Sequence, residues 1–142
     1  MPTRSSRAEW RGDLKQGNGE FEVGSGVFSG AYTFASRFEE GDGTNPEELI
    51  GAAHAACFSM SLANMLAQAG NPAESVRTEA VVHLEPVDGK PTIHTIELKT
   101  RGTVPGIDQA TFAEHAENAK DGCPVSRLYA GATIKLEATL EG

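Results

Sequence analysis

Cysteine is scarce in this chain of 142 residues: only Cys57 and Cys123 occur, and there is no C-x-x-C motif. The cysteines and histidines also lack the spacing of a zinc site, so we expect no metal and no other cofactor. Two isolated thiols have two interpretations. They are either unrelated buried side chains, a common fate of free cysteine, or a redox pair, the usual role of a cytosolic disulfide.

Positive charge is in short supply, with 12 lysines and arginines against 20 aspartates and glutamates and a net charge of −8. An acidic surface repels phosphate backbones and anionic lipids, which argues against nucleic acid or a membrane surface as a partner. The N-terminal segment MPTRSSRAEWRGDLKQGNGE is polar and lacks the apolar stretch of a signal peptide. We therefore expect a cytoplasmic protein.

Charged side chains are absent from residues 49–73, a stretch long enough to raise the question of a membrane span. Its Gly, Ala, Ser, Asn, Gln and His residues are too weakly apolar for a lone helix in lipid, so we expect a helix buried inside protein. A helix without charge on any side needs cover all round. One sheet and one small helix cannot supply it, and we predict that a second subunit does so in a homodimer.

Glycine-rich segments separate three short strands that we expect near residues 8–14, 20–28 and 31–38. The charge-free helix should follow. Asn45 fits its N-cap, Pro46 its first position and Glu48 the capping partner three residues on, and Gly70 fits its C-cap.

The second half of the chain begins with a predicted hairpin, whose arms at 75–87 and 91–104 meet at Asp88-Gly89. On its second arm His94 is expected on the same face as Ile96 and Leu98. The remaining elements are a helix capped by Asp108, a short helix opened by Cys123-Pro124, and an alternating strand over 134–141. The order β-β-β-α-β-β-α-α-β predicts an α+β fold in a single domain, residues 1–142.

Attack on a peroxide requires a thiolate, and a cysteine with an ordinary pKa of about 8.5 is mostly protonated at neutral pH. Cys57 lies too far along its helix for the dipole to help, so a cation must stabilise the anion. Arg37 is the candidate because its guanidinium can hold a thiolate and a peroxide oxygen together, although a solvated surface arginine is the commoner role. Phe38, Phe58 and Met60 are interpreted as ordinary core, with a pocket for an alkyl tail as the alternative.

Cys123 is predicted to cap the short helix, where free backbone N–H groups favour a thiolate. This suits a resolving thiol that attacks a sulfenic acid on Cys57, and equally a cysteine that caps a helix for structural reasons. His54, one turn before Cys57, is either a base or, more commonly, a packed and hydrogen-bonded core histidine. The other three histidines lack metal spacing and are expected to be structural.

Two long segments resemble a known family. The first, residues 37–66, reads RFEEGDGTNPEELIGAAHAACFSMSLANML and closely resembles the signature of the bacterial osmotically inducible protein C (OsmC) family, sister to the organic hydroperoxide resistance (Ohr) proteins. The second, residues 103–128, reads TVPGIDQATFAEHAENAKDGCPVSRL and resembles the region of the family's second cysteine. The similarity extends from about residue 8 to the C-terminus, and the segments TNPEELIGAAHAACFSM and GCPVS favour OsmC over Ohr.

The resemblance implies an intertwined α+β homodimer, with central buried helices wrapped by antiparallel sheets and active sites at the subunit interface. It also implies an enzyme, a thiol peroxidase that reduces organic hydroperoxides and, less efficiently, hydrogen peroxide. Cys57 matches the peroxidatic cysteine, Cys123 the resolving cysteine, Arg37 the arginine that activates the thiolate, and Glu47 the glutamate that pairs with it. The reductant would be a dithiol, of lipoyl type by resemblance.

Glu47 lies ten residues before Cys57, which at ~1.5 Å per residue is about 15 Å along one straight helix. We therefore predict that the glutamate near each Cys57 comes from the partner subunit. Two other functions remain open at this point. One is a stress-induced protein that binds a hydrophobic ligand in the dimer crevice with idle cysteines, and the other is a thiol redox sensor without peroxidase turnover.

Overall fold

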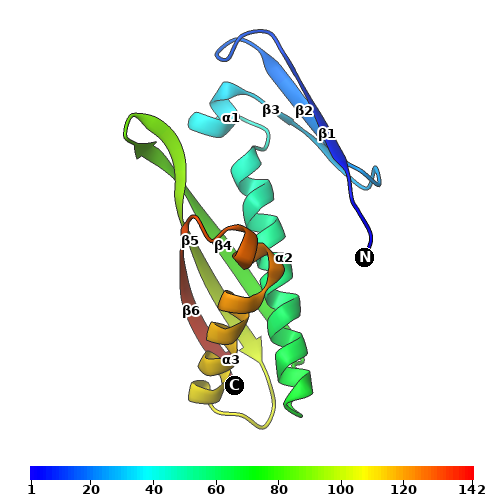
Figure 1. Ribbon diagram of the computed structural model, residues 1–142, viewed down its shortest axis with the longest axis vertical. Helices are drawn as coiled ribbons and strands as arrows, with labels where there is room; N and C mark the ends of the chain where they lie inside the picture. The colour runs from blue at the N-terminus through cyan, green and yellow to red at the C-terminus, as the bar shows by residue number, and fades with distance from the viewer. The chain divides into compact units, whose positions relative to one another are not determined.

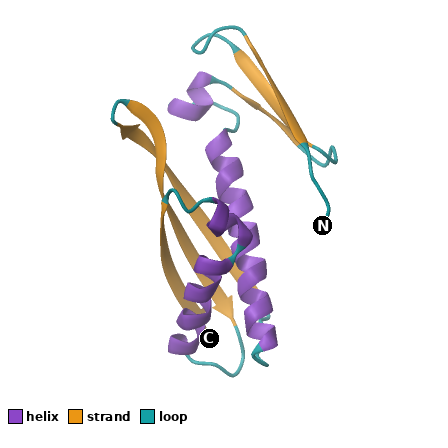
Figure 2. Cartoon of the chain, viewed as in Figure 1, coloured by secondary structure: helices purple, strands orange, loops and turns teal.

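The computed structural model describes all 142 residues, which form six strands and four helices in the order β1-β2-β3-α1-α2-β4-β5-α3-α4-β6 (Figures 1 and 2). The predicted α+β class is confirmed, and the order differs from the predicted one by a single additional helix, α1. The chain divides into two compact units, residues 1–49 and 50–142. The single domain stays a prediction.

The first unit is built on an antiparallel sheet of three short strands, β1 (Ser6–Arg11), β2 (Asn18–Val23) and β3 (Ser29–Tyr32). The rings of Trp10 and Tyr32 pack across β2, with centroids 5.3 Å apart. Gly19 of β2 is the register partner of both, and a Cβ there would meet both rings within 3 Å. The glycine is therefore required for the two aromatic rings to pack against each other.

The third strand is shorter than predicted because a helix, α1 (Phe34–Phe38), interrupts it. Thr33 caps this helix: its hydroxyl accepts from the Ser36 N–H at 3.1 Å, and the Ser36 hydroxyl accepts from the Thr33 N–H at 2.8 Å. This reciprocal pair satisfies two backbone donors at the helix start. The prediction of a strand through residue 38 was wrong, and the cap places Arg37 on a helix.

The long helix α2 (Pro46–Gln68) begins and ends as predicted. The Asn45 side chain accepts from the Glu48 N–H at 2.8 Å, and Gly70 follows the helix with a positive φ of 90°. By length and composition α2 also qualifies as a membrane span, with a mean hydropathy of 1.4. One face of it, however, forms the core of the second unit.

The second unit is a sheet with helices packed on one face (Figure 1). Its elements are β4 (Ser75–Val87), β5 (Lys90–Thr103), α3 (Gln109–Gly122), α4 (Pro124–Leu128) and β6 (Thr133–Glu141). Asp88 and Gly89 join β4 to β5 with positive φ at both residues, as the hairpin turn requires. β6 pairs with β5 in parallel, so this sheet is mixed, whereas the expectation was an antiparallel sheet.

The core of this unit lies between α2, α3 and β5, and its fully buried apolar side chains are Phe58, Leu62, Leu66, Ile96, Leu98, Phe112, Ala116 and Ala119. The opposite face of α2 carries four exposed residues, Ala52, Ala53, Ala56 and Met60, and the exposed fraction of Met60 is 76%. The second unit alone therefore does not supply the predicted cover on every side of α2. The homodimer stays a prediction.

Candidate active site

Arg37 and Glu47 meet in the first unit, as their predicted pairing requires. The guanidinium donates from Nε to Oε1 at 2.9 Å and from Nη2 to Oε2 at 3.1 Å. Glu47 is 8% exposed, and the Arg37 side chain is about one third exposed. A buried carboxylate that accepts both bonds holds the guanidinium in one orientation. Arg37 itself lies at the surface, paired with Glu47, and its role at the thiolate stays a prediction.

An aromatic hollow lies beside this guanidinium, within the same unit. Its lining residues are Trp10, Leu14, Tyr32, Thr33, Phe34, Arg37 and Phe38. Phe38 stacks under the arginine, with Cζ 5.2 Å from the ring centroid. The hollow thus joins an apolar wall to one fixed positive charge, which suits an alkyl group that carries a polar oxygen. Of the residues named from the sequence as core, Phe58 is buried, whereas Phe38 and Met60 are exposed.

Cys57 and Cys123 lie together in the second unit, both as free thiols. Cys57 is half-buried in the middle of α2, and Cys123, at 1% exposure, belongs to the core cluster against which Cys57 packs. The Cys123 thiol lies close enough to the Cys57 thiol to raise its pKa. The structure therefore brings together two cysteines that are far apart in the sequence, within one unit.

The pKa of the Cys57 thiol is raised above its ordinary value, mainly because burial disfavours the thiolate. The Val125 N–H and the Ser61 hydroxyl act in the opposite direction, and the Cys123 thiol adds to the increase. No lysine or arginine of the second unit contributes. The surroundings of Cys57 in its own unit therefore raise its pKa, and activation by a cation stays a prediction.

Cys123 caps α4, as predicted, with Pro124 at the first helical position. Its sulfur accepts from the Ser126 N–H at 3.3 Å, and its thiol donates to Ser126 Oγ at 3.1 Å. Ser126 Oγ in turn lies 2.7 Å from His54 Nε2. His54 is completely buried, so the interpretation as a packed, hydrogen-bonded core histidine is confirmed for one of its two nitrogens.

Sequence reasoning placed Cys57, Cys123, Arg37 and Glu47 in one site, and the structure brings them together as two pairs, one pair in each unit. The contact between Ser126 and Cys123 was not predicted. Ser126 follows the predicted capping residue Cys123 by three positions, and a capping side chain commonly accepts from the backbone N–H at that position. The aromatic hollow beside Arg37 was also missed, because its residues come from three separate elements of the first unit.

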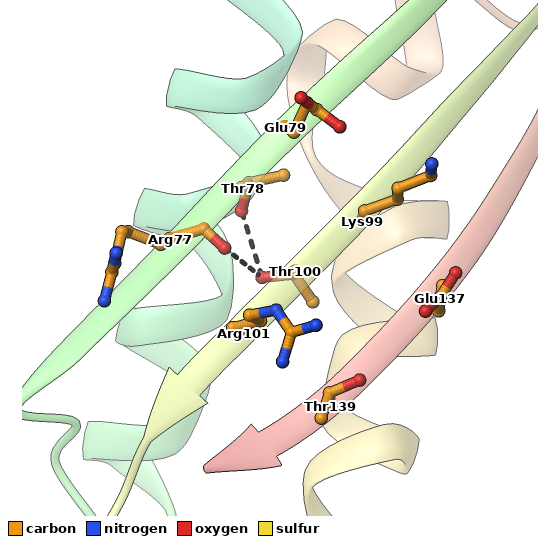
Figure 3. Close-up of a pocket in the computed structure, with 8 residues that line it drawn as sticks. All are labelled: Arg77, Thr78, Glu79, Lys99, Thr100, Arg101, Glu137 and Thr139. Carbon is orange, nitrogen blue, oxygen red and sulfur yellow. Dashed lines mark hydrogen bonds between the residues drawn. The ribbon is translucent and has the colours of Figure 1, made fainter.

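A second hollow lies on the outer face of the β4-β5-β6 sheet and is lined by Arg77, Thr78, Glu79, Lys99, Thr100, Arg101, Glu137 and Thr139 (Figure 3). Glu79, Lys99 and Glu137 are register partners across the three strands, so charges alternate there. The hydrogen bonds in the figure join Thr100 to Thr78 and to the Arg77 carbonyl. No cysteine lines this hollow, and we regard it as a solvated sheet face.

Comparison with known protein families gives one family match: the model described as OsmC-like protein matches residues 39–138. Peroxiredoxin OsmC of Escherichia coli (strain K12) is 48% identical over 139 residues, which cover 97% of this chain and 94% of the relative. An organic hydroperoxide resistance protein of Xanthomonas axonopodis pv. citri (strain 306) is 34% identical over 93 residues, 64% of this chain and 63% of the relative.

Solved structures with the same fold include two close matches in shape. An organic hydroperoxide resistance protein from Elizabethkingia anophelis has a TM-score of 0.76 at 23% identity, covering 100% of this chain and 97% of that one. An OsmC-like protein from Mycoplasma pneumoniae has a TM-score of 0.72 at 17% identity, covering 99% of both chains. At these identities the likeness establishes the fold alone.

Proposed function

The chain belongs to the OsmC-like protein family, and from this premise we propose that it is an enzyme, a thiol peroxidase that reduces organic hydroperoxides to alcohols and hydrogen peroxide more weakly. The observation that carries the proposal is that Cys57 packs against the core cluster that contains Cys123, close enough for the Cys123 thiol to raise the pKa of Cys57. Two cysteines that lie near each other within one unit can form a disulfide and be reduced again, as a peroxidase cycle requires.

The proposed cycle begins with attack of the Cys57 thiolate on the outer peroxide oxygen. The O–O bond breaks, its electrons leave with the alkoxide, and the alkoxide takes up a proton to become the alcohol. Cys57 is left as a sulfenic acid. Cys123 then displaces hydroxide from that sulfur, which gives the Cys57–Cys123 disulfide and water, and an external dithiol reduces the disulfide by exchange. A lipoyl-type dithiol protein is the proposed reductant.

Arg37, oriented by Glu47, supplies the cation that the surroundings of Cys57 lack. Its charge stabilises the thiolate and the alkoxide that develops as the O–O bond breaks. The aromatic hollow beside it would take the alkyl group of the hydroperoxide. Because α2 is one continuous helix, Glu47 and the Cys57 of the same chain are separated by about 15 Å of helix axis. We propose that Arg37 and Glu47 serve the Cys57 of a partner subunit in a homodimer, with the exposed uncharged face of α2 at the interface.

Peroxide turnover by three proteins tests the proposal: wild type, Cys57→Ser and Cys123→Ser, each with cumene hydroperoxide and excess dihydrolipoamide. We expect steady turnover in wild type, none in Cys57→Ser, and an accumulating sulfenic acid, trapped by dimedone, in Cys123→Ser. A protein that only binds hydrophobic ligands would consume no peroxide in any variant. A redox sensor would consume one equivalent and stop. Either of the last two results rejects the proposal.

A further inference from the structure

A buried chain of three polar side chains leads away from the resolving cysteine and has no part in the cycle as described so far. It runs from Cys123 Sγ to Ser126 Oγ at 3.1 Å and from Ser126 Oγ to His54 Nε2 at 2.7 Å. All three residues are at most 4% exposed. The bond between Ser126 and His54 connects α4 to α2 within the second unit. His54 and Ser126 lie 72 residues apart in sequence, and Cys123 and Ser126 lie three apart.

We propose that His54, acting through Ser126, accepts the thiol proton of Cys123 when Cys123 attacks the Cys57 sulfenic acid. This inference rests on the proposed function and assigns the base of its resolving step. The directions of the hydrogen bonds fit it: the Cys123 thiol donates to Ser126 Oγ, so the Ser126 hydroxyl proton is free to point at Nε2, which then accepts. Transfer along both bonds leaves Cys123 as a thiolate, Ser126 as a hydroxyl again and His54 as an imidazolium.

The proton and electron count of the step is balanced. The Cys123 thiolate supplies the electron pair of the new S–S bond, and the S–O bond electrons of the sulfenic acid leave with hydroxide. Hydroxide becomes water with one proton, equal to the one that His54 holds, so the step neither consumes nor releases protons overall. The nascent thiolate is stabilised by the Ser126 N–H, which donates to Cys123 Sγ at 3.3 Å.

The His54 ring is packed in an orientation in which only one of its two nitrogens makes a hydrogen bond. Tyr129, the C-cap of α4, packs edge-to-face against it, with centroids 5.3 Å apart, and the Tyr129 hydroxyl donates to the Ile50 carbonyl at 3.4 Å. Nδ1 is buried and has no hydrogen-bond partner. A histidine kept for packing would be expected to satisfy both nitrogens, because buried polar atoms are nearly always paired. Here the fold directs Nε2 at Ser126 and leaves the other nitrogen unsatisfied.

Few titratable groups face His54. They are the two residues that cap α4, Tyr129 directly and Cys123 through Ser126, and Cys57, which follows His54 by one turn on α2. Burial lowers the pKa of His54, because the charged form of the ring is disfavoured away from water. The imidazole is thus neutral at pH 7, with a lone pair available on Nε2.

The wild-type enzyme provides the first test, by rapid mixing of reduced protein with one equivalent of cumene hydroperoxide and measurement of sulfenic acid decay between pH 5 and pH 10. An internal base with a lowered pKa predicts a decay rate that stays flat from about pH 8.5, the ordinary pKa of a free cysteine, down past pH 6.5. Decay that falls tenfold per pH unit below the thiol pKa overturns the relay. If no sulfenic acid forms, the proposed function fails, and the relay with it.

The variant His54→Gln provides the second test, because its amide oxygen replaces Nε2 as an acceptor but cannot take up a proton. We expect resolution at pH 7 to slow by about a hundredfold, the lower range of general-base effects, and to approach wild type near pH 10, where hydroxide in solution can replace the missing base. Sulfenic acid formation should keep its rate. Ser126→Ala, which breaks the chain and leaves His54 in place, should give the same profile, and His115→Gln on α3 should behave as wild type. Equal slowing at pH 7 and pH 10 would indicate a structural role and overturn the proposal.

Discussion

Arg37 and Glu47 are joined by two parallel hydrogen bonds, from Nε to Oε1 at 2.9 Å and from Nη2 to Oε2 at 3.1 Å. The arginine comes from the short helix α1 and the glutamate from the first turn of α2, so the bonds also connect two elements of the first unit. The third nitrogen, Nη1, makes no hydrogen bond within that unit. The pair is therefore a guanidinium of fixed orientation with donors left for a ligand.

Removing the carboxylate charge should disable this arrangement without removing the arginine. In Glu47→Gln the two charge-assisted bonds weaken, the guanidinium loses its fixed orientation, and we expect kcat/KM for cumene hydroperoxide to fall by about tenfold to a hundredfold. Glu48→Gln is the matched control, since Glu48 is exposed and bonded to Thr44 instead. Equal losses in both variants would count against a specific role for the pair.

The ionisation of Cys57 should depend on Arg37. Burial raises the pKa of the Cys57 thiol in its own unit, and a nearby guanidinium lowers it, because a positive charge favours the anion. In a Cys123→Ser background, the rate of alkylation by iodoacetamide should follow a titration with a midpoint below about 8.5, the ordinary thiol value.

Arg37→Met, in the same background, should move that midpoint above the ordinary thiol value, so that alkylation at neutral pH becomes slow. Arg77→Met on the outer face of the sheet is the control and should leave the midpoint in place. A midpoint that stays low in Arg37→Met would show that another group activates Cys57.

The parts of the fold that the sequence could predict are those specified by neighbouring residues. Asn45, Pro46 and Gly70 delimit α2, and Asp88-Gly89 places the hairpin turn, because caps and tight turns depend on side chains a few positions away. Helix α1 was not predicted, since its capping box uses Ser36 in place of the usual Glu or Gln, and its aromatic residues favour a strand.

Features that depend on distant residues could not be predicted. His94 was expected to face inward with Ile96, but a bulge after His83 shifts the register, so that Leu84 pairs with Ile93. The His94 ring then stacks on His83 and bonds to Glu85. The bond between His54 and Ser126 likewise arises only when α4 packs on α2. No local sequence pattern predicts either contact.

Packing in the second unit makes a prediction about stability. A Cβ at Gly102 of β5 would lie 2.4 Å from the buried ring of Phe112, which has no space to move. Gly102→Ala should therefore lower the free energy of unfolding by about 1–3 kcal/mol, the usual cost of overpacking a core. Gly131→Ala, where a Cβ meets nothing within 4 Å, is the matched control. Urea titrations that give the two variants the same midpoint would contradict the packing argument.

Complementation between two inactive variants decides which subunit supplies Arg37 and Glu47. Cys57→Ser keeps the arginine–glutamate pair but has no peroxidatic thiol, whereas Glu47→Ala keeps the thiol but has no partner for Arg37. If the pair of one subunit serves the Cys57 of the other, a heterodimer of these variants contains one complete site, and two differently tagged chains purified together should regain peroxidase activity. If each subunit serves itself, both sites in the heterodimer are defective and activity stays at the level of the separate variants. The control is a heterodimer of wild type with Cys57→Ser, which retains one intact site under either arrangement, because one Cys57 and both arginine–glutamate pairs remain. We expect the partner-subunit result, because α2 is a single helix that holds Glu47 and Cys57 about 15 Å apart along its axis.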